Sequence, residues 1–491
     1  MPQLLALSRA ARLVGVPRAA LQKRIQDGSL HSYEGMVSTE ELLQAYPETS
    51  LEDSGLLEKT TQIKQEAFGR RVRDRMLPPK EVLAERLFEQ SRELADVKTH
   101  LKRYHNLVVE MQEQLQTLSR DAPESARHAL ANLDAWIEQQ LQTVLVTQAP
   151  SALAVMDDML RIMSAHVTIQ PSRHDFFVDG TDTLLEAALK SGLALNYGCS
   201  SGNCGLCKAR VVDGQVLKTK HHDYVLSDAE KQQGYCLMCS YTAVSDLTLE
   251  ALEASSARDI PPQEISARVK TVSPLGPDMM LLHLQTPRSQ RLRFLAGQTV
   301  TLGLPGAGSA EFPITTCPCD DRNLQFHIER GEGGAFGARV FAGLSNTENV
   351  SVYGPWGDYD YKEEGRHEIL FLAFGRGFGL IKSLAEHIMA RESANDMLLV
   401  WAAYPPNGHY MSNLCRSWTD ALDNFRFDPV GIAGQNPALE AAWTVDKLLV
   451  DHPEVRSYDI YLAGPDVYVG PAAEQLQAAG ISDEQLVALA V

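Results

Sequence analysis

Long apolar runs are missing from this chain, and their absence excludes a class of protein. No stretch of the 491 residues approaches the roughly 18 to 20 consecutive apolar residues that a membrane-spanning helix needs. The start, MPQLLALSRAARLVGVPR, has arginines inside and after its apolar stretch, without the basic cap and small-residue cleavage site of a signal peptide. We therefore expect a soluble cytoplasmic protein that makes no contact with a membrane.

Cysteine is scarce, and basic residues are outnumbered. Eight cysteines in a reducing compartment indicate metal or redox chemistry, rather than disulfides, where they lie close together. The formal net charge is −18, and the acidic excess lies in residues 121–491, with 46 Asp and Glu against 27 Lys and Arg. Such a surface repels nucleic acid, so any DNA contact must come from the N-terminal end.

The first 47 residues have the pattern of two short helices joined by a turn. The residue pattern predicts one helix over residues 8–14 and a second over residues 18–26, with Gly15-Val16-Pro17 as the turn between them. The segment LHSYEGMV predicts a two-stranded wing, and Ser38-Thr39-Glu40-Glu41 predicts a capping box that opens another helix.

This stretch resembles the MerR-like or excisionase-like winged helix-turn-helix family. The resemblance implies that the second helix enters the major groove of DNA. The side chains that would contact DNA are Arg18, Gln22, Lys23 and Arg24. The alternative is a small helical adaptor that keeps this fold and binds protein.

A heptad repeat follows the N-terminal region. From Leu83 to Leu118 the apolar residues recur in alternating steps of four and three, and only Gln90 interrupts them. Pro78-Pro79 precedes this stretch and Asp121-Ala122-Pro123 ends it. The pattern predicts a bounded coiled-coil helix, which pairs most simply with a second copy in a homodimer. Packing on residues 124–146 and 151–165 of the same chain is the alternative.

Four cysteines have spacing suited to a metal centre. Cys199, Cys204 and Cys207 form C-x4-C-x2-C in a loop rich in glycine and serine, and Cys236 and Cys239 follow downstream. Zinc ribbons, the alternative, use two C-x2-C knuckles instead. The loop resembles that of plant-type ferredoxins. The resemblance implies a [2Fe-2S] cluster with Cys239 as the fourth ligand, and Cys236 as a nearby thiol or a spare ligand.

The last 125 residues or so alternate strand-like and helix-like segments, which predicts a parallel α/β sheet. Together with FLAGQTVTLGL, SVYGPWGDYDY and FGRGFGLIKSLAEHI, they resemble the ferredoxin-NADP reductase family. That family has a FAD-binding antiparallel barrel followed by a nicotinamide-binding domain. With a ferredoxin domain upstream, the domain order resembles oxygenase reductases and CDP-6-deoxy-glucoseen reductase-like proteins.

The flavin-binding elements of that family are altered in this sequence. Its Arg-x-Tyr-Ser/Thr motif falls on residues 310–316, where the arginine is absent. The resemblance implies that Phe312 stacks on the flavin and that Thr315 or Thr316 supplies a hydroxyl. The phosphate-binding Gly-x-x-Ser element falls on Gly334 to Gly337 and keeps its backbone amides, with Arg339 as a substitute cation.

The nicotinamide-binding elements are altered as well. The glycine-rich loop falls on Phe374 to Leu380, in which Gly375 and Gly377 remain and Arg376 either binds a phosphate or plugs the site. The later Cys-Gly-x-Pro element keeps Gly464 and lacks the cysteine. No catalytic residue is assigned. Cys317 and Cys319 form a C-x-C that is either a redox-sensitive pair or two small buried residues.

The sequence thus predicts a multidomain chain of α+β and α/β classes. Its parts are a winged helix-turn-helix (1–47), a helical and coiled-coil region (56–165), a β-grasp ferredoxin (166–255), a flavin-binding β-barrel (262–362) and a parallel α/β domain (366–491). The leading hypothesis is electron transfer from NAD(P)H through FAD and the cluster to a partner oxygenase or dehydratase. The alternatives are a redox-sensing dimeric transcription regulator and a cluster-bearing scaffold.

Overall fold

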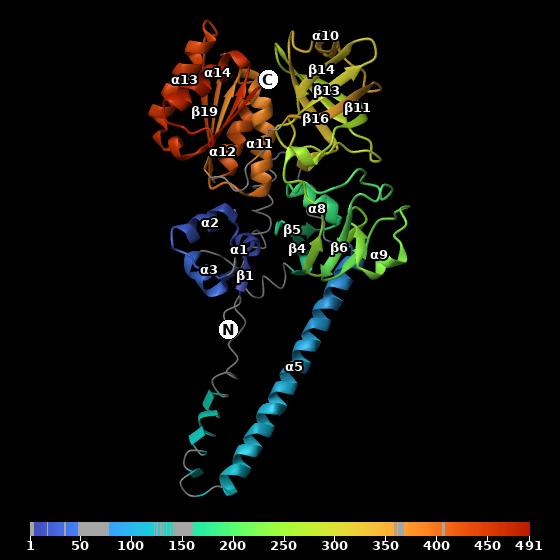
Figure 1. Cartoon of the computed structure of the whole chain (residues 1–491), viewed down its shortest axis with the longest axis vertical. Helices are drawn as coiled ribbons and strands as arrows, with labels where there is room; N and C mark the ends of the chain where they lie inside the picture. The colour runs from blue at the N-terminus through green and yellow to red at the C-terminus, as the bar shows by residue number, and fades with distance from the viewer. Residues whose placement is uncertain are drawn as a thin grey trace. The chain divides into compact units, whose positions relative to one another are not determined.

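A computed structural model describes residues 4–47 except 17, 34 and 35, residues 78–121, scattered positions from 123 to 140, and residues 161–491 except 358–360, 362–367 and 405–407 (Figure 1). The chain divides into two compact units, residues 78–163 and residues 1–77 with 164–491. Among the described residues, no helix combines the length and apolar character that crossing a bilayer requires.

The N-terminal region contains the two helices predicted for it. Helix α1 spans Leu7–Val14 and helix α2 spans Arg18–Gln26. The predicted wing is present as strands β2 (Ser32–Tyr33) and β3 (Met36–Ser38), which pair antiparallel. The sequence did not reveal strand β1 (Leu4–Ala6), which pairs with β3 and completes a three-stranded sheet.

The predicted capping box at Ser38 is wrong in its second half. Helix α3 (Thr39–Ala45) begins at Ser38, whose side chain accepts a hydrogen bond from the Glu40 N–H. The Glu41 carboxylate, which would have reached back to Ser38, instead accepts from the His31 N–H at 3.0 Å. Glu41 therefore ties α3 to the turn before the wing.

The predicted rod is helix α5, which runs without interruption over the 42 residues Lys80–Asp121. Its apolar stripe stays exposed in the single chain, and Leu101 and Tyr104 are each 67 % exposed. Much of the rest of the expected helical region, including residues 56–77 and 141–160, lies outside the described residues.

The next part is a five-stranded mixed sheet with the order β5-β4-β10-β6-β8. Its strands are β4 (Ser164–Gln170), β5 (Asp175–Asp179), β6 (Lys208–Asp213), β8 (Tyr235–Leu237) and β10 (Leu247–Glu250). Only β4 and β10 pair in parallel. Helix α8 (Leu184–Lys190) begins with a complete capping box between Thr183 and Glu186, and it buries its leucines in the same core as the sheet.

A six-stranded antiparallel sheet with the order β14-β13-β16-β11-β12-β15 follows. Its strands are β11 (Gln263–Gly276), β12 (Met279–Gln285), β13 (Thr299–Leu304), β14 (Gly308–Pro313), β15 (Asn323–Glu329) and β16 (Asn349–Trp356). Helix α10 (Gly334–Ala342) packs its Phe336 and Val340 into the core of this sheet.

The C-terminal part is the predicted parallel sheet, with the order β19-β18-β17-β20-β21. Its strands are β17 (Glu368–Phe374), β18 (Asp396–Ala403), β19 (Phe425–Gly431), β20 (Asp459–Gly464) and β21 (Leu486–Ala490). Helices α11 (Phe378–Arg391) and α12 (Ser412–Ala421) share one core with it. Helices α13 (Pro437–Asp451) and α14 (Asp466–Ala478) share a second, as in a sheet covered on both faces.

Candidate functional site

The cysteine-rich loop lies between α8 and β6, and two glycines determine its path. Gly202 and Gly205 have positive φ angles of 80° and 75°. A Cβ atom at Gly205 would lie 2.3 Å from the Tyr224 ring, and one at Gly202 would lie 2.5 Å from the His222 Cβ. Any larger side chain would therefore displace the loop that carries Cys199, Cys204 and Cys207.

The thiols of this loop and of Cys239 have surroundings that suit cluster ligands. The Cys207 Sγ lies 3.2 Å from the Cys239 Sγ. This hydrogen bond lowers the pKa of Cys239 to about 6, against the effect of burial, and it raises the pKa of Cys207. Burial raises the pKa of Cys199, but the N–H groups of Ser201, Cys204 and Asn203 outweigh it and bring that pKa to about 7.

Cys236 has different surroundings. It is buried in β8, opposite Ala209 of β6. Burial, followed by the charge of Cys239, raises its pKa to about 12. The Cys239 sulfur lies beside that of the loop residue Cys207, and this position favours Cys239 over Cys236 as the fourth ligand.

The four cysteines supply the donor set of a two-iron cluster, because a [2Fe-2S] cluster is held by four thiolates. Hydrogen bonds from the N–H groups of Ser201, Asn203 and Cys204 stabilise the Cys199 thiolate. The donor set and the amides around Cys199 therefore fit the cluster.

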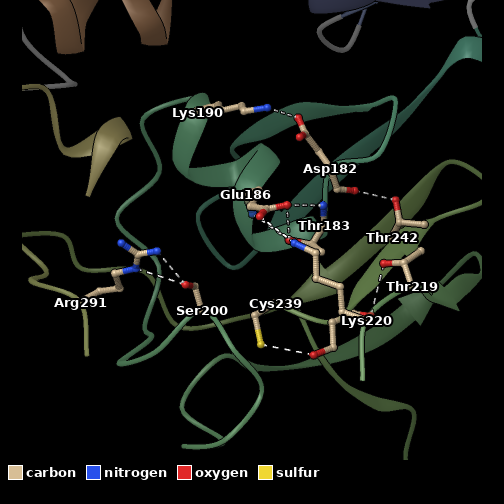
Figure 2. A network of polar contacts seen from close by, with 11 residues as sticks. Asp182, Thr183, Glu186, Lys190, Ser200, Thr219, Lys220, Cys239, Thr242 and Arg291 are labelled. Atoms are coloured by element: carbon tan, nitrogen blue, oxygen red, sulfur yellow. Dashed lines mark hydrogen bonds and ion pairs between the residues drawn. The ribbon is translucent and has the colours of Figure 1, made fainter. Parts of the chain in front are cut away.

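Arg291 joins the cysteine-rich loop to the six-stranded sheet (Figure 2). Its Nε and Nη2 donate to the Ser200 Oγ at 3.2 and 3.1 Å. Its backbone N–H donates to the Gly198 oxygen at 2.9 Å, and the Ser200 N–H donates to the Arg288 oxygen at 3.1 Å. Both neighbours of Cys199 are thus fixed by the segment that follows β12, a relationship that the sequence did not reveal.

A buried carboxylate completes this junction. Asp321 lies 3.7 Å from the Arg291 Nε, and the Tyr197 hydroxyl bonds to it. Burial raises the pKa of Asp321, although the charge of Arg291 opposes that effect. The Thr286 hydroxyl holds the same segment in place by donating to the Asp321 main-chain oxygen at 2.9 Å.

The flavin-type run, residues 310–316, ends beside α11. Phe312 is buried, with its ring 5.5 Å from that of Phe336, so its ring belongs to the core of the six-stranded sheet. The Thr315 hydroxyl donates to the Gln325 oxygen at 3.0 Å. The Thr316 hydroxyl is buried and has no hydrogen-bond partner among the described residues. Of the two candidate hydroxyls, Thr315 is therefore already engaged, whereas Thr316 is not engaged by any described residue.

The start of α10 is where the sequence predicts a phosphate-binding element, and its backbone is one that favours glycine. Gly333 and Gly334 have positive φ angles of 67° and 56°, and a Cβ at Gly337 would lie 1.8 Å from the Glu332 oxygen. Arg339 does not face this helix start, because its guanidinium donates to the Gly343 oxygen beyond the other end of the helix. It also pairs with Glu348 at 3.2 Å.

Arg376 lies beside the same helix start, although it belongs to the loop after β17. Its guanidinium is 3.4 Å from Glu329 and 3.8 Å from Glu332, and it donates to the main-chain oxygen of Val491 at 2.7 Å. Glu332 directly precedes Gly333, the residue before α10. The structure therefore brings the start of α10, which belongs to the predicted flavin-binding part, next to Arg376, which belongs to the loop predicted to bind the nicotinamide cofactor.

The glycines of the nicotinamide-type loop serve close packing. A Cβ at Gly377 would lie 2.3 Å from the Ala463 oxygen, and one at Gly464 would lie 2.7 Å from the Phe374 Cβ. Next to them, Phe378 stacks on Trp401 with ring centroids 3.9 Å apart. Gly375 has a positive φ of 52° and no atom within 4 Å of a Cβ placed there, so it alone leaves open space beside the loop.

The four residues predicted to contact DNA differ in their surroundings. Arg18 pairs with Asp175 of β5 at 2.9 Å. Arg24 donates to the Ala45 oxygen at 2.7 Å and lies over the Tyr46 ring. Lys23 is exposed and Gln22 is partly exposed.

Two further arginines join α1 to the ferredoxin-type sheet. Arg9 pairs with Asp246 at 3.0 Å, and Arg12 pairs with Asp179 at 2.9 Å. The Arg12 guanidinium also lies over the Phe177 ring at 4.6 Å. The basic face of the N-terminal region therefore contacts an acidic face of this sheet.

Comparison with known proteins supports the assignment of the cysteine-rich segment. Residues 167–244 match the family of 2Fe-2S iron-sulfur cluster binding domains. This match confirms the predicted presence of an iron-sulfur domain in this part of the chain.

Two curated proteins align with most of the chain. The CDP-6-deoxy-L-threo-D-glycero-4-hexulose-3-dehydrase reductase of Yersinia pestis is 27 % identical over 305 residues, which are 62 % of this chain and 91 % of that protein. The reductase component of propane 2-monooxygenase from Rhodococcus jostii is 26 % identical over 330 residues, covering 65 % and 89 %. Among solved structures, the Amycolatopsis cytochrome P450 reductase GcoB aligns with 65 % of this chain and 97 % of its own, with a TM-score of 0.41 and 22 % identity.

Proposed function

We propose that this protein is an electron-transfer reductase that moves electrons from NAD(P)H through FAD to a [2Fe-2S] cluster, and from there to a partner oxygenase or dehydratase. The observation that carries the proposal is the direct bonding of the cysteine-rich loop to the six-stranded sheet through Arg291 and Ser200. Such a contact holds the cluster loop at a fixed place on the flavin-type part. The similarity to reductase components of oxygenase and dehydrase systems supports the same function.

Cys199, Cys204, Cys207 and Cys239 would hold the cluster, which carries one electron at a time when bound. The amides of Ser201, Asn203 and Cys204 stabilise the Cys199 thiolate. Cys207 and Ser240 both hydrogen-bond to Cys239. These contacts favour the charged sulfurs that iron requires.

The flavin site differs from that of the resembled family in the origin of its cation. Ala310 stands where the family has its arginine. Arg376, which lies beside the start of α10, would take over the pairing with the FAD pyrophosphate. The buried Thr316 hydroxyl, which has no partner among the described residues, would donate to the flavin ring.

An anaerobic titration tests this function. NADH or NADPH is added to the full-length protein with its cluster and FAD assembled, and the visible spectrum is followed. We expect both the flavin and the cluster bands to bleach within seconds. In Cys239→Ser the flavin band alone should bleach. Bleaching by dithionite but by neither nicotinamide would overturn the proposal.

A matched pair of variants tests the role of Arg376. Arg376→Ala should weaken FAD binding roughly 10- to 150-fold, because a hydrogen bond to a charged group contributes about 1.5–3 kcal/mol. Arg339→Ala should leave the affinity unchanged, since that side chain faces the other end of α10. Fluorescence titration with FAD measures both. Equal losses in the two variants would remove Arg376 from the site.

The exposed apolar stripe of α5 supports a second proposal, that two copies pair through this helix and present two N-terminal regions to DNA. Replacing Leu94 and Leu101 by Lys should convert a dimer into a monomer in light scattering, whereas Lys98→Glu should not. In a dimer that binds DNA, Arg18→Ala and Lys23→Ala should weaken binding to its own promoter, and the affinity should fall steeply with salt. A monomeric wild type, or unchanged DNA binding, contradicts this second proposal.

A further inference from the structure

Cys317 and Cys319 are joined by a disulfide, with Cα atoms 5.2 Å apart. They lie directly after the flavin-type run, and the short helical turn η3 (Pro318–Asp320) begins between them. The other six cysteines form no disulfide, and four of them are the proposed cluster ligands. The proposed electron-transfer function does not use this pair.

This disulfide has little value as a structural cross-link. It joins residues only two positions apart, and a disulfide restrains the unfolded chain less as the loop that it closes becomes shorter. Other contacts hold the two residues just before the pair. Lys382 donates to the Thr315 oxygen at 3.0 Å, and Ser383 donates to the Thr316 oxygen at 2.7 Å. A chemical role therefore explains the pair better than a structural one.

The two sulfurs differ in access and in stabilisation. Cys317 is fully buried, whereas Cys319 is partly exposed. The Cys319 backbone N–H donates to the Cys317 Sγ at 3.2 Å, and such a bond stabilises a thiolate on Cys317. An incoming thiolate can therefore reach Cys319, and the geometry favours Cys317 as the leaving group.

We propose that Cys317–Cys319 is a reversible thiol–disulfide exchange site for small thiols of the glutathione class, and that its state is transmitted to the cysteine-rich loop. In the first step the thiolate forms a bond to the Cys319 Sγ, the S–S bond breaks, and Cys317 leaves with the electron pair. A second thiolate then attacks the mixed disulfide and releases Cys319. The protein gains two electrons, the two protons come from the two thiols, and the thiols leave as one disulfide.

Transmission to the cysteine-rich loop follows from the residues next to the pair. Asp321, two positions after Cys319, faces Arg291 and Tyr197. Arg291 in turn bonds to Ser200, beside Cys199. Opening the disulfide removes the covalent link across the turn that leads to Asp321, whose position then depends on hydrogen bonds such as the one that its main-chain oxygen accepts from Thr286. We expect this change to reach the loop through Arg291.

The test uses the full-length protein with its cluster assembled, equilibrated in buffers of varied ratio of reduced to oxidised glutathione. Free thiols are then alkylated and counted by peptide mass spectrometry. We expect Cys317 and Cys319 to pass together from unlabelled to labelled as the ratio rises, and to return when it is lowered. The buried Cys415 should stay unlabelled throughout. If the pair is labelled at every glutathione ratio, or stays unlabelled at every ratio, the proposed exchange site is overturned.

A second readout follows the cluster by its visible circular dichroism in the same buffers. We expect the spectrum to change at the same glutathione ratio at which the pair becomes labelled. The double variant Cys317→Ser, Cys319→Ser should not show this spectral change. The Cys415→Ser variant should behave as the wild type. A labelling transition without any spectral change would overturn transmission to the cysteine-rich loop. Because no nicotinamide or flavin is added, a failed reductase assay does not affect this test.

Discussion

The Arg291 guanidinium donates two hydrogen bonds to the Ser200 hydroxyl, although the two residues are 91 positions apart. Ser200 follows Cys199, and Arg291 is buried beside Asp321. One side chain therefore connects a cysteine of the iron-sulfur loop to a buried carboxylate of the neighbouring sheet. Figure 2 shows the guanidinium directed at the Ser200 hydroxyl.

Arg291→Ala should lower the free energy of unfolding by about 3–5 kcal/mol, because it leaves a buried carboxylate without its cation. The side chains of Arg291 and Asp321 are only 6 % and 14 % exposed, so solvent screens the pair weakly. Urea unfolding followed by the cluster absorption measures the loss. Arg330→Ala, which breaks an exposed pair with Asp278, should cost less than about 1 kcal/mol. Similar losses of unfolding free energy in both variants would contradict the role of Arg291 as the cation that balances the buried Asp321.

Cys239→Ser should abolish or strongly shift the visible absorption of the cluster, and Cys236→Ser should leave it unchanged. The reason is that the Cys239 sulfur lies 3.2 Å from the sulfur of the loop residue Cys207, whereas Cys236 is buried in β8 opposite Ala209 of β6. Absorption spectra and iron analysis of protein purified without oxygen test this directly. The opposite pattern would show that Cys236 is the fourth ligand.

His327 should make the protein less stable below about pH 6.5. Burial, aided by the charge of Lys382, lowers its pKa to about 3. Between these two pH values the unfolded state binds a proton that the folded state does not, so stability falls as the pH falls, by up to about 1.4 kcal/mol per pH unit.

His327→Gln removes this titration. Between pH 7 and pH 5 the wild type should lose about 2 kcal/mol more than the variant, as measured by urea unfolding at both pH values. Identical pH dependence in the two proteins would mean that the folded state accepts the proton on His327.

Arg12→Glu should loosen α1 from the ferredoxin-type sheet, because it places two acidic groups together in place of the pair with Asp179. Asp179→Arg in the same protein should restore part of the contact, with a coupling of about 1 kcal/mol for a partly exposed pair. Hydrogen exchange of the α1 amides reports the loosening. Lys23→Glu, at an exposed position of α2, is the control. Unchanged exchange in Arg12→Glu would contradict the contact.

Local sequence patterns predicted local structure well. The two N-terminal helices and the long α5 each depend on residues within one or two helical turns, and all are present. The parallel C-terminal sheet was also predictable, because its strands are continuous apolar runs between amphipathic helices.

Contacts between distant segments were not predictable in the same way. Nothing near Arg291 in the sequence indicates Ser200, and nothing near Arg376 indicates the start of α10. Family motifs assigned Phe312 to a flavin, whereas the structure packs its ring on Phe336. The neighbours that position such side chains come close only in the folded chain. One sequence read by itself therefore does not indicate these contacts.

The contact between the N-terminal region and the ferredoxin-type sheet has a consequence for the order of synthesis. Arg12 is made 167 positions before Asp179. At about 5–20 residues per second, a ribosome needs roughly 8 to 33 s to produce the partner. During this interval the acidic strand that pairs with the basic face of the N-terminal region has not yet been synthesised. Other polyanions in the cell can therefore bind this basic face before the ferredoxin-type sheet forms.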